Sequence, residues 1–74
     1  MLKFITATDT MTQEDILINL DQIIKIQSDP TGRTLFTDIN GNAFNVDEPL
    51  GNIAASIRLI QAAQLSQKGS GSDD

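Results

Sequence analysis

The sequence lacks the residue types on which most small-molecule chemistry in proteins depends. Its 74 residues include no cysteine, histidine, tyrosine or tryptophan. The absence of cysteine excludes a disulfide, and without histidine as well a metal site would have to be built from oxygen ligands alone. The common general bases and nucleophiles are missing too. We therefore expect a protein that is not an enzyme, with no catalytic residues, no cofactor and no metal site.

Basic residues and long apolar runs are also scarce. Ten Asp and Glu against five Lys and Arg give a net charge of −5. That charge repels phosphate backbones, and the cations are scattered, so we expect no nucleic-acid partner. No segment approaches the run of about 18 apolar residues that a membrane span needs. The apolar run at the N-terminus is too short for a signal peptide. We expect a protein that is cytoplasmic as synthesised and has no membrane partner.

The shortage of aromatics and the short chain limit the core. Three Phe are the only aromatic residues, so Ile, Leu and Val must supply most of the buried area. The sequence predicts one domain over residues 1–66 and a flexible Gly/Ser/Asp tail over 67–74. A domain of this size buries only about 60% of its unfolded-chain surface and is marginally stable alone. With disulfides excluded and the usual metal ligands missing, self-association is the expected source of additional stability.

The first part of the chain is predicted to form short strands. β-branched and apolar residues with partial alternation mark them. The polar residues 9–14 connect the first two strands. Asn19 and the pair Asp21-Gln22 predict a bulge or sharp bend between the second and third. The predicted strands cover residues 2–7, 16–20, 23–26, 34–39 and 43–46.

Two turns follow from local chemistry. Asp29 can accept bonds from backbone N–H groups, Pro30 fixes its own φ, and Gly32 tolerates positive φ, so a turn is expected there. Asn40-Gly41 is the strongest short hairpin signal in a sequence. We predict a type I′ turn, with positive φ at both Asn40 and Gly41.

The C-terminal segment is predicted to be a helix over about 48–67. Asp47 or Glu48 would place an acid at the positive end of the helix dipole, and Pro49 suits the first turn. The helix is expected to end near Lys68-Gly69.

This helix is apolar on two sides. At 100° per residue one stripe suits packing on a sheet, and a second stripe lies roughly opposite it. A helix on a single small sheet needs only the first stripe, so the second predicts a partner interface. The first stripe contains Leu50, Ile53, Ala54, Ile57 and Ile60. The predicted interface contains Ala55, Leu59, Ala62 and Ala63. The expected fold is α+β: a small, mostly antiparallel sheet of four or five strands, or an open barrel, with one C-terminal helix.

Other chemical patterns have simpler structural explanations. Residues 38–42 begin like a calcium loop, but the glycine comes too early and the distal glutamate is missing, so a hairpin turn is favoured. Asp47-Glu48 could form an acid pair, yet acids are ordinary at a helix start. Ser56 and Lys25 have no evident activating neighbour in the sequence.

The order of these features resembles the small flagellar-operon proteins of the FlbD/SwrD type. The resemblance covers roughly residues 1–62 and rests on the run 16–26 with its Asn-x-Asp-x-Ile bend, the Asn40-Gly41 hairpin and a helix opening near Glu48. It implies a shared small β-rich fold and no catalytic or ligand residues. The plan also resembles short uncharacterised marine-phage proteins, many of which begin with a run like residues 1–5.

The second apolar face of the helix and the small core predict a function in assembly. We expect a homo-oligomeric building block or accessory subunit that also binds another protein. The connection 9–14 is longer than in the flagellar family, which is a departure from that family's pattern. The resemblance of residues 1–5 to the phage proteins favours a phage virion structural protein, as does the helix, in which Ala, Ser and Gln replace the flagellar family's charged residues. A flagellar accessory protein is the alternative. The strand order is also similar to LytTR-type DNA-binding domains, a second alternative that the net charge of −5 disfavours.

Overall fold

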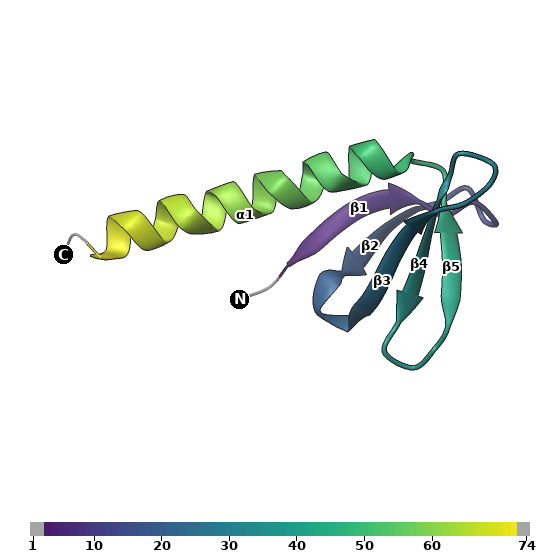
Figure 1. Cartoon of the computed structure of the whole chain (residues 1–74), viewed down its shortest axis with the longest axis horizontal. Helices are drawn as coiled ribbons and strands as arrows, with labels where there is room; N and C mark the ends of the chain where they lie inside the picture. Colours follow the sequence, from purple (N-terminus) through teal and green to yellow (C-terminus); the bar gives the residue numbers. More distant parts are fainter. Residues whose placement is uncertain (1–2, 73–74) are drawn as a thin grey trace.

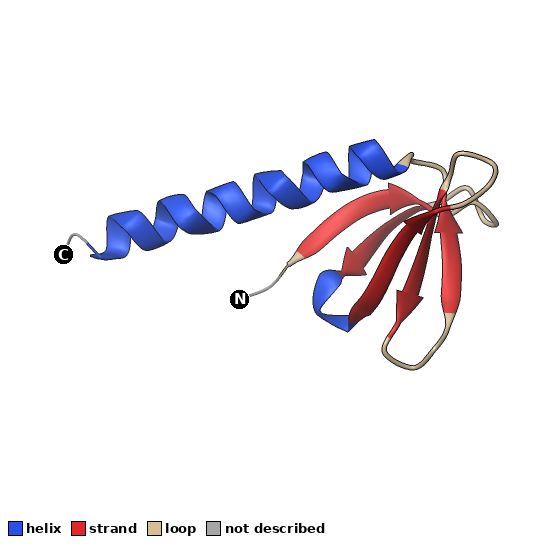
Figure 2. Ribbon diagram, viewed as in Figure 1, coloured by secondary structure: helices blue, strands red, loops and turns tan. Residues whose placement is uncertain are grey.

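The computed structural model describes residues 3–72, and the side chains of residues 3–63. It contains five strands, one long helix and a short 3-10 helix (Figures 1 and 2), which confirms the predicted α+β class. In chain order the elements are β1 (Phe4–Thr8), β2 (Asp15–Asn19), η1 (Leu20–Gln22), β3 (Ile23–Ser28), β4 (Thr34–Asp38), β5 (Ala43–Val46) and α1 (Leu50–Ser72).

The strands form two small antiparallel sheets rather than one. β1 pairs with β2, and β3, β4 and β5 pair in that order. A single bridge between Asp9 and Val46 joins the sheets, and next to it the Asp47 N–H donates to the Thr8 carbonyl at 2.9 Å. The end of β1 therefore lies beside the end of β5, while β2 and β3 form no ladder with each other and the sheets stay open.

The chain changes direction between β2 and β3 with the help of two devices. The Asn19 side chain caps η1 by accepting the Asp21 N–H at 3.0 Å, so the predicted bend is confirmed. A bulge follows in β3, because the register with β4 shifts between Ile23 and Lys25 and leaves Ile24 without a partner. The bulge turns Ile24 outward, and this residue is 66% exposed.

The core lies between the two sheets and the start of α1. Alternation along each strand directs one set of aliphatic side chains inward. The Phe36 and Phe44 rings stack across β4 and β5 with centroids 5.3 Å apart, which adds about 1 kcal/mol beyond area burial. Buried Thr34 satisfies its hydroxyl by donating to the Glu48 carbonyl at 2.7 Å. The buried apolar residues are Ile5, Ala7, Ile18, Phe36, Val46 and Ile53.

The β4–β5 hairpin has a turn where it was predicted, but of a different type. Only Gly41 has positive φ (+85°); Asn40 does not, so the predicted type I′ turn is wrong. The Gly41 N–H donates to the Asp38 carbonyl at 3.0 Å, and Asp38 Oδ1 accepts the N–H groups of Asn40 and Asn42 at 2.9 Å each. This is a three-residue loop, a type I turn followed by a left-handed glycine, and the Asp38 carboxylate selects it.

The β3–β4 hairpin repeats this loop. Asp29 Oδ1 accepts the N–H groups of Thr31 and Arg33 at 2.8 and 3.0 Å, and Gly32 has φ +87°. The Gly32 N–H donates to the Asp29 carbonyl at 3.1 Å. The predicted roles of Asp29 and Gly32 are thus confirmed, and both hairpins share an Asp-x-x-Gly pattern.

Helix α1 differs from its predicted form at both ends. It begins at Leu50, and its first turn contains no acid, because Asp47 and Glu48 precede it and point elsewhere. Leu50, assigned to the sheet-facing stripe, is 36% exposed. The helix continues past Gly69 and Gly71 to Ser72, because each glycine disfavours a helix by only about 1 kcal/mol and does not by itself end it. The predicted flexible tail stays a prediction.

Candidate functional site

The outer face of α1 contains the four residues predicted to bind a partner. Ala55, Leu59, Ala62 and Ala63 are all exposed, and Leu59 is 72% exposed. Figure 1 shows that the helix runs well past the strands, so its far half projects from the body of the molecule. The structure brings these residues together as one apolar stripe, and their role in an interface stays a prediction.

The inner face of α1 is buried unevenly. Ile53 is 2% exposed and belongs to the core, whereas Ile57 and Ile60 are only partly buried and pack against its margin. Burial therefore decreases along the helix toward the projecting half. The sheet-facing stripe is confirmed for Ile53, Ile57 and Ile60, but Ile53 provides the main anchor.

A groove opens where the inner face of α1 leaves the sheets. It has a volume of about 270 Å³ and lies between α1, η1 and β3. We call it the β3–α1 groove. Its lining is mostly aliphatic and includes Ile24 at the bulge. Asp21 and Gln61 also line it, and the exposed Lys3 and Lys25 stand on its rim. The sequence analysis did not predict this groove. Its only signal was the run 23–26, which contains one more isoleucine than a regular strand can bury on one face. The aliphatic lining consists of Leu20, Ile23, Ile24, Ile26, Ile57 and Ile60.

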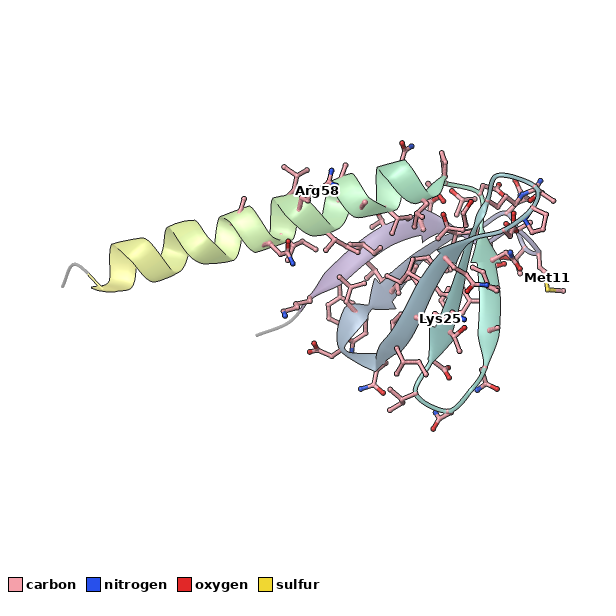
Figure 3. All side chains as sticks on the ribbon, viewed as in Figure 1. Met11, Lys25 and Arg58 are labelled. Carbon is pink, nitrogen blue, oxygen red and sulfur yellow. The ribbon has the colours of Figure 1, made fainter. Side chains whose placement is uncertain are left out.

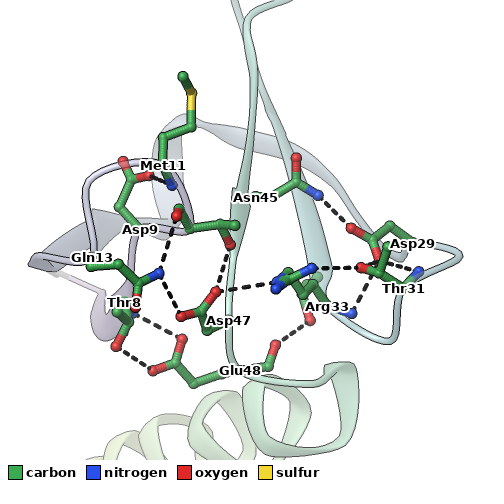
Figure 4. A network of polar contacts seen from close by, with 12 residues as sticks. Thr8, Asp9, Met11, Gln13, Asp29, Thr31, Arg33, Asn45, Asp47 and Glu48 are labelled. Carbon is green, nitrogen blue, oxygen red and sulfur yellow. Dashed lines mark hydrogen bonds and ion pairs between the residues drawn. The ribbon is translucent and has the colours of Figure 1, made fainter.

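At the other end of the strands, three carboxylates hold the connections together (Figure 4). We call this group, Asp29, Asp47 and Glu48 with their hydrogen-bond donors, the carboxylate network. Glu48 Oε1 accepts the Thr8 N–H at 2.8 Å and Oε2 accepts the Thr8 hydroxyl at 2.9 Å. Burial raises the pKa of Glu48, but these bonds outweigh it and hold the pKa below its ordinary value.

Asp47 ties the β1–β2 loop to the β3–β4 loop. Its carboxylate accepts from Gln13 Nε2 and the Thr10 hydroxyl at 2.9 Å each, and from Arg33 Nε at 3.3 Å. The hydrogen bonds from Gln13 and Thr10, helped by the Arg33 charge, lower the pKa of Asp47. The same contacts support Gln13 in its left-handed conformation (φ 59°), which is uncommon for a residue with a side chain.

Asp29 completes the carboxylate network. Its Oδ2 accepts Asn45 Nδ2 at 2.6 Å, which connects the β3–β4 loop to β5. The hydroxyl and N–H of Thr31 and the N–H of Arg33 lower the pKa of Asp29. Ionised carboxylates already engaged by protein donors make poor general acids at neutral pH, so the network acts as a structural clamp.

The remaining candidates from the sequence have structural roles or no partner for chemistry. The Asp38 carboxylate is occupied by N–H groups of its own loop, so the calcium-like pattern there forms a hairpin turn. The Ser56 hydroxyl donates to the Asn52 carbonyl at 3.2 Å. Among residues 3–63, whose side chains are described, no group of three His, Cys, Asp or Glu could hold a metal ion. Over the same described range no helix is both long enough and apolar enough to cross a membrane.

Comparison with known proteins gives no match to this chain among family models, curated proteins or solved structures.

Proposed function

We propose that this chain is a non-enzymatic protein–protein interaction module that assembles with copies of itself through the outer face of α1. The observation that carries the proposal is the exposure of Leu59 within a stripe of exposed alanines on a helix that extends beyond the sheets.

The physical basis is the burial of this stripe against a second helix. A fully buried leucine side chain contributes about 1.5–3 kcal/mol, and small residues on either side let two helix backbones approach closely. At 1.5 Å per residue the 23 residues of α1 span about 34 Å, which is long enough to pair with a second helix beyond the sheets. A domain of this size gains from such a contact, because its core contains six buried apolar residues among residues 3–63.

Leu59→Glu tests the proposal, with Leu17→Glu as the matched control. Leu17 lies on β2 and is 69% exposed, so both variants replace a similarly exposed leucine by the same charge. We expect Leu59→Glu to lower the sedimentation coefficient at micromolar concentration while the circular dichroism spectrum is retained. Leu17→Glu should assemble like the parent.

A parent chain that sediments as a single 8.0 kDa species at all concentrations would contradict the proposal. If Leu59→Glu sediments like the parent, the contact between copies does not involve the outer face of α1.

The biological setting that we propose is a phage virion, with a flagellar accessory role as the alternative. The support is the resemblance of residues 1–5 to marine-phage proteins and the near absence of charge from α1, in which Arg58 and Lys68 are the only charged residues. The neighbouring genes test this directly. Capsid or tail genes favour the virion, and rod or stator genes favour the flagellum.

A further inference from the structure

Met11 is the most exposed large apolar side chain among the described residues. It is 93% exposed, in the loop between β1 and β2, and Figure 3 shows it pointing away from the body of the molecule. Nearly all of the Met11 surface is therefore available for contact with another molecule.

Hydrogen bonds brace the loop that carries Met11. The Met11 N–H donates to Asp9 Oδ1 at 2.8 Å, and the Gln13 N–H donates to the Asp9 carbonyl at 2.7 Å. Gln13 keeps its positive φ with side-chain bonds to the Thr10 carbonyl at 3.0 Å and to Asp47 Oδ2 at 2.9 Å. Met11 is therefore presented by an ordered loop, which lowers the entropy lost on docking.

The β3–α1 groove lies at the opposite end of the strands. β1 starts next to Lys3, on the groove rim, and ends at Thr8, beside the Met11 loop. The groove is aliphatic and open to solvent, and its volume of about 270 Å³ accommodates an unbranched, adaptable side chain such as methionine.

The charges at the two ends are complementary. The end with Met11 is strongly acidic, and Arg33 there is already paired with Asp47. The groove is rimmed by Lys3 and Lys25, two of the five basic residues in the chain, with Asp21 as the acid in its lining. Opposite charges around a matching apolar contact favour docking of one end on the other. The acidic residues in or beside the connections at the Met11 end are Asp9, Glu14, Asp15, Asp29, Asp47 and Glu48.

We propose that copies of this chain also associate head to tail, with Met11 of one copy inserted into the β3–α1 groove of the next and the acidic end meeting Lys3 and Lys25. This inference rests on the proposed self-assembly and adds a second, distinct surface to it. The two contacting surfaces differ, so the contact is heterologous and generates a ring or a filament rather than a closed dimer.

Complementation of two variants tests the head-to-tail contact. Met11→Glu removes the inserted side chain and keeps the groove, while Ile24→Glu blocks the groove and keeps Met11. Each variant alone should assemble less than the parent by sedimentation velocity over a concentration series. An equimolar mixture should form species larger than either variant forms alone, because an intact Met11 on one variant then meets an intact groove on the other. Leu17→Glu is the control and should assemble like the parent.

The outcomes separate this inference from the proposed function. If Met11→Glu and Ile24→Glu assemble like the parent while Leu59→Glu dissociates, the head-to-tail contact is wrong and the outer face of α1 stands. If the mixture forms nothing beyond its components, the two surfaces do not meet. Should Ile24→Glu fail to fold, exposed Lys25→Glu replaces it and is expected to weaken assembly most at low salt. A Lys25→Glu variant that assembles like the parent at low salt overturns the charge pairing.

Discussion

At the residue scale, the Glu48 side chain binds a distant strand instead of capping the helix that follows it. An acid before a helix is ordinarily explained by the helix dipole. Here both carboxylate oxygens accept bonds from Thr8, forty positions earlier, while the Glu48 carbonyl accepts the hydroxyl of Thr34. One residue thus fixes β1, β4 and the start of α1 relative to one another.

Two glycines at this scale should respond oppositely to the same substitution. Gly41→Ala should lower the free energy of unfolding by about 1–2 kcal/mol, because a Cβ is disfavoured at φ +85°. Gly51→Ala should raise it by up to about 1 kcal/mol, because Gly51 lies in α1 with open space where a Cβ would be placed. Urea denaturation monitored by circular dichroism measures both. If Gly41→Ala is as stable as the parent, the left-handed turn assigned to Gly41 is wrong.

At the element scale, α1 is anchored at one end and unsupported at the other. Ile53 lies in the core, and Ile57 and Ile60 pack against its margin. The outer-face residues Ala55, Leu59, Ala62 and Ala63 are exposed. A second helix or the end of another copy can therefore reach the projecting part without disturbing the core.

The uneven burial of α1 predicts a graded response to truncation. Ile53→Ala should cost about 2–4 kcal/mol, because it leaves a cavity among fully buried neighbours. Ile57→Ala should cost less, because Ile57 is partly exposed and water can fill the space that it leaves. Thermal unfolding of the two variants compares them directly. A larger loss for Ile57→Ala would mean that the groove is closed in solution.

At the scale of the whole molecule, the carboxylate network couples stability to pH. The folded-state pKa values of Asp29, Asp47 and Glu48 lie below their ordinary values, so the folded state binds protons less readily than the unfolded chain. The stabilisation is complete above the ordinary values of 3.8 for Asp and 4.5 for Glu, and it is lost as the pH falls through the lower folded values.

Glu48→Gln should show this coupling against Glu14→Gln as the control. Both substitutions remove one negative charge, but Glu14 is an exposed loop residue. Glu48→Gln should be less stable than Glu14→Gln in urea at pH 7. The free energy of unfolding of Glu48→Gln should fall less between pH 5 and pH 3, a range that extends about one unit around the ordinary carboxyl pKa values. Parallel pH profiles for the two variants would exclude Glu48 from the coupling.

The sequence by itself determined what depends on neighbouring residues. Apolar periodicity and turn chemistry placed five strands and one helix, the bend after Asn19, the turns at Gly32 and Gly41 and the exposed stripe around Leu59. These features follow from interactions within a few positions along the chain, which a sequence displays directly.

Only the tertiary structure decided which distant residues meet. The hydrogen bonds from Thr8 to Glu48 and from Gln13 to Asp47 span forty and thirty-four positions. Through these bonds Glu48 and Asp47 bind distant residues instead of the start of α1, where an acid was expected. The β3–α1 groove likewise needs α1 to cross β3 at the bulge of Ile24. The physical reason is that a hydrogen bond or an apolar contact depends on position in space, and the packing of the two sheets and α1 fixes that position.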